Sequence, residues 1–333
     1  MLLVIFGAGA SYDSVHHLPP PRPSAAGQQN FGTPVVVAAP EPYEQHRPPL
    51  ANQLFDNRNW FIPLMTEFGD FRSLVPSLRT SDSVEGRLSE IQKEAETLEV
   101  RHCQLASICY YLQTLILTCE QHWNREHRGI TNHASFFETL ELWRHSTNEE
   151  VWVVTFNYDT MIEQAMNQVF GMSFDKFTDY ILDHRYKLIK LHGSVDWGHE
   201  VNPIIRPRTA GEVARNIAKF QLSAEYQKVG RSACPPQHLE ALGNALDRVT
   251  KIMTIGWRAT ERHFIGMLRK PLTGLQGDVD LMVISGSDKG ASETLTNLGF
   301  ETQKSERKRA LRGDGFSGLV TQVGRGYLQQ FLR

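Results

Sequence analysis

Three short motifs in this 333-residue chain combine small and polar residues that could bind and act on a phosphorylated ligand. The first, Gly7-Ala8-Gly9-Ala10-Ser11, directly follows the apolar run 2–6. Glycines at such a turn let the backbone approach a diphosphate, and the N–H groups of the following helix favour its negative charge. The third glycine of the dinucleotide fingerprint is missing, as is an acidic residue ending a second strand some twenty residues later. A plain strand-to-helix turn is therefore an equally good interpretation.

The second motif is Phe156-Asn157-Tyr158-Asp159, which follows the apolar run 151–155. The amide of Asn157 can both donate and accept, so it could orient a ribose, a nicotinamide or a water molecule. The Asp159 carboxylate could fix that loop or add negative charge near a developing cation. The structural alternative is a helix start, because Thr160 and Glu163 have the spacing of a capping box.

The third motif is Lys190-Leu191-His192-Gly193-Ser194, at the end of a further apolar run. An unperturbed histidine is largely neutral near pH 7, so His192 could accept a proton from water or from a ribose hydroxyl. A hydrogen-bonded structural histidine is the alternative. Two weaker signals, Gly256-Trp257 and Ser285-Gly286-Ser287, place small residues where a ribose or a second phosphate could approach, and plain turns explain either equally well.

Five short apolar runs rich in β-branched residues precede these motifs, and each predicts a β-strand. Because they are almost continuously hydrophobic, we expect parallel strands that are covered on both faces. Loops at the carboxyl ends of such strands are where open α/β sheets bind ligands. The five predicted strands are residues 2–6, 151–155, 187–191, 249–255 and 280–284.

A long insertion separates the first two predicted strands. Residues 15–50 are rich in proline, glycine and glutamine, which indicates a long loop or flap. Residues 83–123 carry leucine and isoleucine at helical spacing and predict helix. We therefore expect a sheet core formed by residues 1–14 and 130–333, and an inserted helical subdomain formed by residues 51–129.

Further helices are expected within 199–245, with a break at Pro235-Pro236, and from residue 256 to 272. A basic stretch comes near the end of the chain. It predicts solvated surface, with contact to an acidic or phosphate-bearing partner as the alternative. Its members are Lys304, Arg307, Lys308, Arg309 and Arg312.

Composition argues against several classes of protein. The net charge of −2 and the pI near 6.7 provide no broad attraction for nucleic acid or for an anionic membrane. The four cysteines form no C-x-x-C pair, so we expect free thiols rather than a zinc knuckle or a disulfide framework. No apolar run is long enough for a membrane span, and the chain opens on a strand rather than a signal peptide. These features predict a cytoplasmic protein.

The motifs as an ordered set resemble the sirtuins, and more closely the sirtuin-like NADase domains of prokaryotic antiviral defence systems. Sirtuins carry a Gly-Ala-Gly phosphate loop, a Gln-Asn-Ile-Asp segment, a catalytic histidine in a Leu-His-Gly context and later Gly-Ser loops, and this chain has counterparts in the same order. The resemblance extends from residue 3 to about 325 and includes Pro48-Pro49-Leu50. It implies a Rossmann-like α/β fold, a parallel sheet with helices on both faces and an inserted helical subdomain.

By this resemblance the chain is expected to be an NAD glycohydrolase that cleaves NAD to nicotinamide and ADP-ribose, as the toxic effector of abortive antiphage defence. Its catalytic residues would be Asn157, His192 and Asp159. The zinc ribbon of sirtuin deacylases is missing, since only Cys234 lies between His192 and Gly256, so no zinc is expected. The nucleotide-binding residues would be Gly7, Ala8, Gly9, Ala10, Ser11, Asp13, Gly256, Trp257, Ser285, Gly286 and Ser287.

Two other functions remain open: an NAD-dependent protein deacylase and a non-catalytic nucleotide-binding sensor. An enzyme that drains cellular NAD must be restrained, so we expect control through assembly. The expected partners are further copies of the chain and, by resemblance, a HerA-type ATPase or a short Argonaute module. Residues 83–123 and 304–312 are the candidate contact surfaces. Neither a membrane nor direct nucleic-acid binding is expected.

Overall fold

The centre of the fold is a six-stranded parallel sheet in the order β3-β2-β1-β4-β5-β6. The computed structural model describes residues 1–15, 45–81, 84–95, 97–183, 185–197, 234–273, 279–299 and 309–333. The strands are β1 (Leu2–Phe6), β2 (Val151–Thr155), β3 (Tyr186–Lys190), β4 (Lys251–Ile255), β5 (Asp280–Ile284) and β6 (Arg309–Arg312). The predicted Rossmann-like α/β fold is therefore confirmed, because this is the doubly wound strand order.

The five predicted strands are present, with small differences at their ends. β3 begins and ends one residue earlier than predicted, and β4 begins at Lys251 because Val249 closes a turn onto Leu246. The sixth strand is not predicted, because its residues belong to the basic stretch interpreted as surface. β6 lies at the edge of the sheet with Leu311 45% exposed, and an edge strand does not need the continuous apolar run that marks a buried one.

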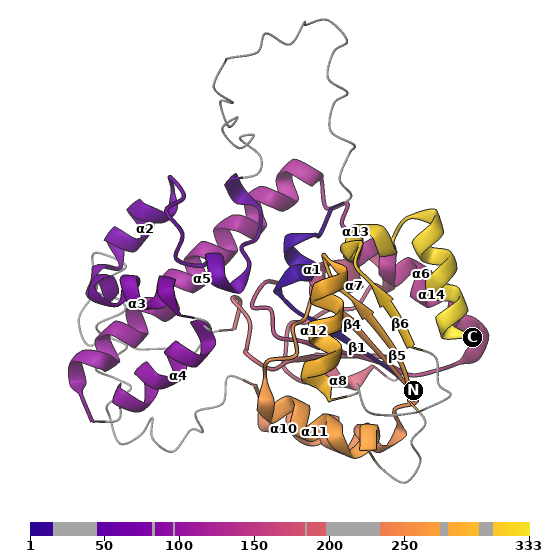
Figure 1. The fold of residues 1–333 in the computed structure, drawn as a ribbon. Helices are drawn as coiled ribbons and strands as arrows, with labels where there is room; N and C mark the ends of the chain where they lie inside the picture. The colour runs from indigo at the N-terminus through magenta and orange to yellow at the C-terminus, as the bar shows by residue number, and fades with distance from the viewer. Residues whose placement is uncertain are drawn as a thin grey trace, which may run out of the picture.

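Side chains of the sheet alternate between two apolar clusters, one on each face. Leu2, Val4 and Phe6 of β1 contribute to the first cluster, while Leu3 and Ile5 contribute to the second. Each fully buried aliphatic side chain of this kind stabilises the fold by about 1.5–3 kcal/mol. The first face is covered by α6 (Asn132–Thr147), α7 (Met161–Phe170), α13 (Gly315–Leu319) and α14 (Gln322–Leu332), and the second by α10 (Pro236–Ala245), α11 (Arg262–Thr273) and α12 (Asp288–Leu298) (Figure 1).

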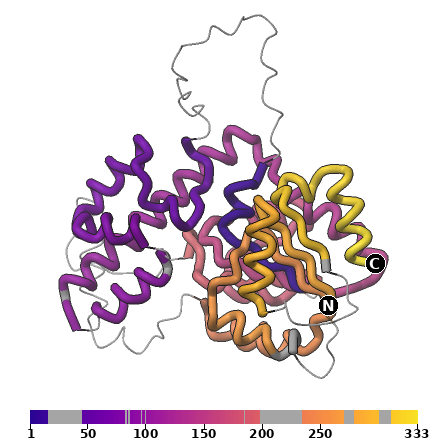
Figure 2. Tube along the Cα trace, in the orientation of Figure 1, coloured from indigo at the N-terminus to yellow at the C-terminus, as the bar shows by residue number. Residues whose placement is uncertain are grey.

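The segment between β1 and β2 contains a group of helices beside the sheet (Figures 1 and 2). The helices share an apolar cluster of their own, built around Phe61, Phe71 and Tyr111. The predicted helix at 83–123 is present as two helices, since Leu98 has an extended backbone between them. After α1 (Ala8–Tyr12), the elements are η2 (Ala51–Gln53), α2 (Phe61–Glu67), η3 (Gly69–Leu74), α3 (Val75–Thr80), α4 (Val84–Ala95) and α5 (Glu99–His127).

Some predicted segments lie partly or wholly outside the described residues. These are most of the proline-rich stretch 15–50, the part of 199–245 before Cys234, and the basic residues Lys304, Arg307 and Lys308. Within the described part, α10 begins at Pro236 with Pro235 before it, because proline fits a first helical turn, and the predicted helix before these prolines lies outside the described residues. α11 starts at Arg262, not at residue 256. No helix in the described ranges is long and apolar enough to cross a membrane.

The order of the strands reverses between β1 and β4, and the two loops that meet there touch backbone to backbone. Gly7 N donates to Ile255 O at 3.0 Å, and Gly9 N donates to Gly256 O at 3.0 Å. Gly256 has a φ of +62°, and a Cβ built on it would lie 2.3 Å from Ala10 N. Glycine is therefore required at this position for both its conformation and its size.

We expect Gly256→Ala to destabilise the fold by more than about 2 kcal/mol, because the added methyl group meets backbone atoms and the φ is unfavourable for alanine. The control is Gly266→Ala, since Gly266 lies on the exposed side of α11 and a Cβ added to it would have no other atom within 4 Å. That change should be neutral or stabilise by about 0.5–1 kcal/mol. Denaturant unfolding would measure both, and equal stability of the two variants would contradict the expectation.

Candidate functional site

The Gly7 to Ser11 turn lies where the sheet order reverses, at the carboxyl ends of β1 and β4. This is the position at which doubly wound sheets bind nucleotides. Three of its amides are already used, since Gly7 N and Gly9 N donate to the β4 loop and Ala10 N donates to Gly7 O at 2.9 Å. α1 is only five residues long. Its dipole would stabilise a bound diphosphate less than that of a long helix. The main feature that this turn offers a diphosphate is therefore close approach to the backbone of Ala8 and Gly9, which are both half-buried.

Asn157 joins the loop after β2 to the turn after β1. Its Nδ2 donates to Gly7 O at 3.0 Å and to Ser11 Oγ at 2.8 Å, and the Ser11 hydroxyl donates in turn to Asp159 Oδ2 at 2.7 Å. All three side chains belong to buried residues, with exposures of 3–7%. Both donor hydrogens of the Asn157 amide and the hydroxyl hydrogen of Ser11 are therefore engaged within the protein. The amide oxygen of Asn157 is what remains to orient a ligand.

A buried ion pair lies beneath the same loop. Lys190 Nζ at the end of β3 contacts Glu163 Oε1 of α7 at 2.7 Å and also donates to the backbone carbonyl of Asp159. The ammonium group is completely buried, and burial raises the pKa of Glu163 while the nearby Lys190 charge opposes that rise. Tyr180 OH donates to the same carboxylate at 3.3 Å. The pair holds α7, β3 and the Asp159 loop together.

The capping box suggested for Thr160 and Glu163 does not form. Thr160 precedes α7, but its hydroxyl donates to Glu120 of α5 and accepts from the side chain of Gln164, and it caps no backbone amide of the helix. Glu163 points instead to Lys190. The first turn of α7 is held from Asp159, whose Oδ1 accepts from Met161 N at 3.2 Å.

His192 is half-buried and packs with its ring against the loop after β2. Its centroid lies 5.1 Å from that of Phe156 and 5.9 Å from that of Tyr158. Phe156 in turn stacks on Trp257 of the β4 loop, at 5.3 Å and 11° between ring planes. The aromatic contacts thus connect the third motif to the second, and the second to Gly256-Trp257.

Asp13 and residues 285–287 lie further along this edge and have structural partners. The Asp13 carboxylate accepts from Ser317 N at 2.8 Å and from the Ser317 hydroxyl, so it holds the start of α13. Ser287 caps α12, since its Oγ accepts from Gly290 N at 3.1 Å. Ser285 N donates to Arg312 O. Nucleotide binding by these residues stays a prediction.

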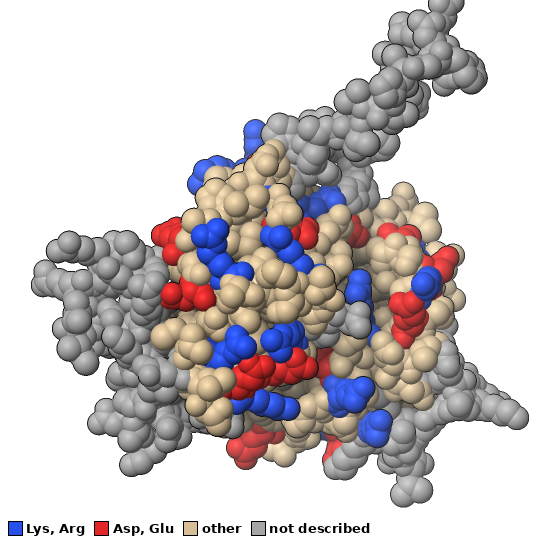
Figure 3. All heavy atoms as spheres, turned by 60° about the vertical axis from the view of Figure 1, so that its left-hand side comes forward, with Lys and Arg blue, Asp and Glu red and all other residues tan. Residues whose placement is uncertain are grey.

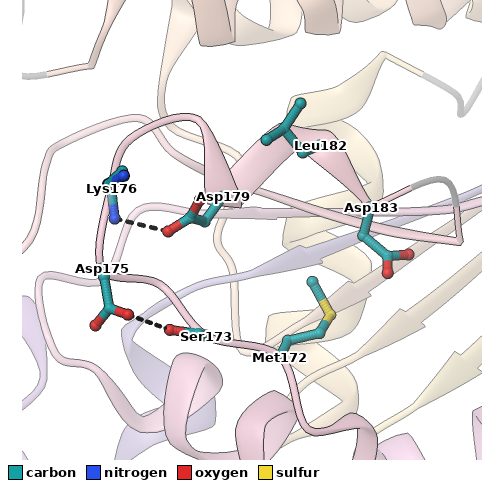
Figure 4. A pocket seen from close by; sticks show the side chains of 7 residues that line it. All are labelled: Met172, Ser173, Asp175, Lys176, Asp179, Leu182 and Asp183. Atoms are coloured by element: carbon teal, nitrogen blue, oxygen red, sulfur yellow. Dashed lines mark hydrogen bonds between the residues drawn. The ribbon is translucent and has the colours of Figure 1, made fainter.

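A pocket of about 500 Å³ on the described surface is lined by none of the motif residues and opens beside the segment that leads into β3. Figure 4 shows that Asp175 contacts Ser173 and Asp179 accepts from the backbone of Lys176, and Asp183 binds Arg185. The carboxylates of this pocket are thus already partnered. Within the described ranges no group of three or more His, Cys, Asp or Glu side chains is placed to hold a metal.

Comparison with known proteins gives no family for this chain. No protein-family model matches it, and a search of curated proteins finds no match.

Three charged residues near the motifs are given no role at the site by the sequence patterns: Lys190, Glu163 and Glu120. Lys190 carries a signal, because a lysine that ends a buried apolar strand must find a partner. Glu163 has the spacing of a capping residue, and Glu120 resembles the many other charges along an amphipathic helix. Only the fold brings Glu120 to the start of α7, where it accepts from Thr160 N at 2.8 Å.

Burial, followed by the charge of Asp159, raises the pKa of Glu120 to about 7. Hydrogen bonds from Thr160 and the charge of Lys190 oppose that rise. Glu120 is 3% exposed, so water screens the effect little. Because the folded-state pKa lies above the unfolded value of about 4.3, the contribution of Glu120 to stability is fully present below about pH 4. It is lost as the pH rises through about 7.

We therefore expect Glu120→Gln to stabilise the protein relative to wild type more at pH 8 than at pH 5, by an amount approaching about 3 kcal/mol. The glutamine keeps an oxygen for Thr160 N but carries no charge that must be buried. Thermal unfolding of both proteins across this pH range measures the difference. Glu126→Gln, an exposed change on the same helix, is the control, and a wild-type-to-variant difference independent of pH would contradict the assignment.

Lys190→Met should lower the free energy of unfolding by about 3–5 kcal/mol, because it leaves the Glu163 carboxylate buried without its cation. Lys190→Met combined with Glu163→Gln should recover at least half of that loss, since the second change removes the unpaired charge. Denaturant titration of the single and double variants gives the coupling. Lys289→Met, in a surface pair, should leave the midpoint almost unchanged. A double variant no more stable than the single one would contradict the role of the pair.

Proposed function

We propose that the chain is an NAD glycohydrolase, which cleaves NAD to nicotinamide and ADP-ribose. The observation that carries the proposal is the meeting of the first two motifs where the strand order reverses. Asn157 contacts both Gly7 and Ser11 there, and the aromatic contacts of His192 and Phe156 add the third motif and Trp257. A nucleotide lying over Gly7 and Gly9 would reach these side chains.

In this reaction the bond between C1′ of the ribose and the nicotinamide nitrogen breaks, and nicotinamide leaves as a neutral molecule. A water oxygen forms the new bond to C1′ and loses a proton. His192 is the group we assign to accept that proton, which is typically worth about 10²–10⁴-fold in rate. The Asn157 oxygen would orient the ribose or the water. Asp159 would stabilise the positive charge that develops at C1′.

Figure 3 shows that basic and acidic side chains are interspersed on the face formed by α2 to α5, the helical part of the chain, so the described residues of this face form no broad patch of one charge. An NAD-consuming effector would be restrained by assembly with further copies of itself or with a partner protein. Within the described residues, the helical part is the surface we propose for such contacts.

A nucleotide-binding sensor is the second candidate, because the polar hydrogens of Asn157 and Ser11 are bonded within the protein. Such a sensor would bind NAD without consuming it. Deacylation of a peptide remains a third activity, and the same experiment separates all three. Purified protein is incubated with NAD, with and without an acetyl-lysine peptide, and the products are separated by chromatography.

We expect wild-type protein to release nicotinamide and ADP-ribose without any peptide. His192→Ala should lower the turnover number at least 100-fold, since it removes the proton acceptor. Asn157→Ala should do the same and also lower stability, because it breaks two buried hydrogen bonds. His145→Ala, an exposed change on α6, is the matched control. Full turnover by the His192 variant would refute the assignment, and binding without cleavage in wild type would favour the sensor.

A further inference from the structure

α5 bonds through its side chains to the motif-bearing loops after β2 and β3 and to the segment just after α1. At 29 residues it runs from the helical part towards α1 (Figure 1). Trp123 Nε1 donates to Ser14 Oγ, just after α1, at 2.8 Å. Gln113 Nε2 donates to Val195 O, in the loop after β3, at 2.6 Å. Glu120 contacts the loop after β2.

Glu120 makes the most concentrated of these contacts. One carboxylate oxygen accepts from Thr160 N at 2.8 Å, and the other accepts from the Thr160 hydroxyl and from Gln164 Nε2. Asn124, one turn further along α5, adds a bond to Gln164 Oε1 at 2.6 Å. An acidic side chain supplied by another helix thus satisfies the amino end of α7, where anions are favoured.

The contacts follow one stripe of α5. Gln113, Glu120 and Asn124 are separated by seven and four residues, which at 3.6 residues per turn puts them on the same side of the helix. The loops also enter the apolar cluster of the helical part, because Val195 and Tyr158 pack there. Val195 N donates to Tyr158 O at 2.8 Å, so the loops after β2 and β3 are bonded to each other as well.

We propose that Glu120 is a positioning residue for the site, and that through it the inserted helices hold Asn157 and Asp159 in place. The hydrogen bond from the Thr160 amide to Glu120 fixes the residue directly after Asp159. The Asp159 carboxylate in turn accepts from Ser11 and fixes its side chain. A shift of α5 would therefore be passed to the loop after β2 and from there to the turn after β1. The catalytic part of this inference rests on the proposed NAD cleavage, and the positional part does not.

Charged groups from several elements face Glu120. Asp159 approaches from the loop after β2, and its charge raises the pKa of Glu120. Lys190 approaches from β3, and its charge lowers it. The hydrogen bonds from Thr160 favour the ionised form of Glu120 but do not offset its burial, so the buried contact weakens as the pH rises through about 7.

The test compares Glu120→Ala, Glu120→Gln and the exposed α5 control Glu126→Ala in the full chain. For Glu120→Ala we expect the turnover number for NAD to fall about 10- to 100-fold, as for a misplaced group, with KM changed less than about threefold. Glu120→Gln keeps an acceptor for Thr160 N and should recover most of the rate. A folded Glu120→Ala protein with wild-type turnover would overturn the proposal.

Amide hydrogen exchange gives a readout that does not depend on activity. In Glu120→Ala we expect the amides of Thr160, Asn157 and Val195 to exchange at least tenfold faster, since the loops after β2 and β3, which are bonded to each other, both lose this anchor on α5. Faster exchange at Thr160 alone would show a local bond only and would refute positioning. If wild-type protein does not cleave NAD, the proposed function fails, and the exchange data still decide the positional claim.

Thr160→Ala tests the same contact from its other side and replaces Glu120→Ala if that variant does not fold. It removes the hydroxyl bond to Glu120 and keeps the amide bond, so we expect a loss of about three- to tenfold in turnover and a smaller rise in exchange at Asn157. Wild-type values of both quantities in this variant would overturn the proposal.

Discussion

The fold depends on the close approach of two backbones between β1 and β4. Gly7 and Gly9 lie against Gly256, and a Cβ added to any of the three would come within 3 Å of the opposing chain. β1 is the central strand from which the chain winds outward in both directions. The contact therefore sets the distance between the loop after β1 and the loop after β4, which carry the first motif and Gly256-Trp257.

The polar groups around the junction are mostly bonded to one another. Asn157 gives both its hydrogens to protein acceptors, Ser11 gives its hydrogen to Asp159, and Lys190 is divided between Glu163 and a carbonyl. Networks that are satisfied in this way are rigid, because losing one member leaves the others buried without partners. A ligand would meet a preorganised arrangement of acceptors and aromatic rings rather than a set of loose donors.

Buried strands could be predicted because burial on both faces leaves an unbroken apolar run, as in residues 2–6. β6 could not, since only its protected side needs apolar residues. The positions of the motifs at strand ends could be predicted from the same rule. The strand order could not, because the apolar runs mark where strands lie and not which strands pair. The role of Asp13 at α13 and of Glu120 at α7 depends on contacts between segments more than 35 residues apart, which spacing in the sequence does not encode.

The position of β1 has a consequence for how the chain acquires this structure. Leu2 is paired with Val151 on one side and with Lys251 on the other, so the central strand is synthesised well before either of its neighbours. At about 5–20 residues per second, β1 waits on the order of 10–50 s for its second neighbour. Until β2 is synthesised this apolar strand has no sheet to join, and until β4 is synthesised one of its edges stays unpaired. Pairings of such long range also make folding slow, so we expect unpaired strand edges to persist while the chain folds.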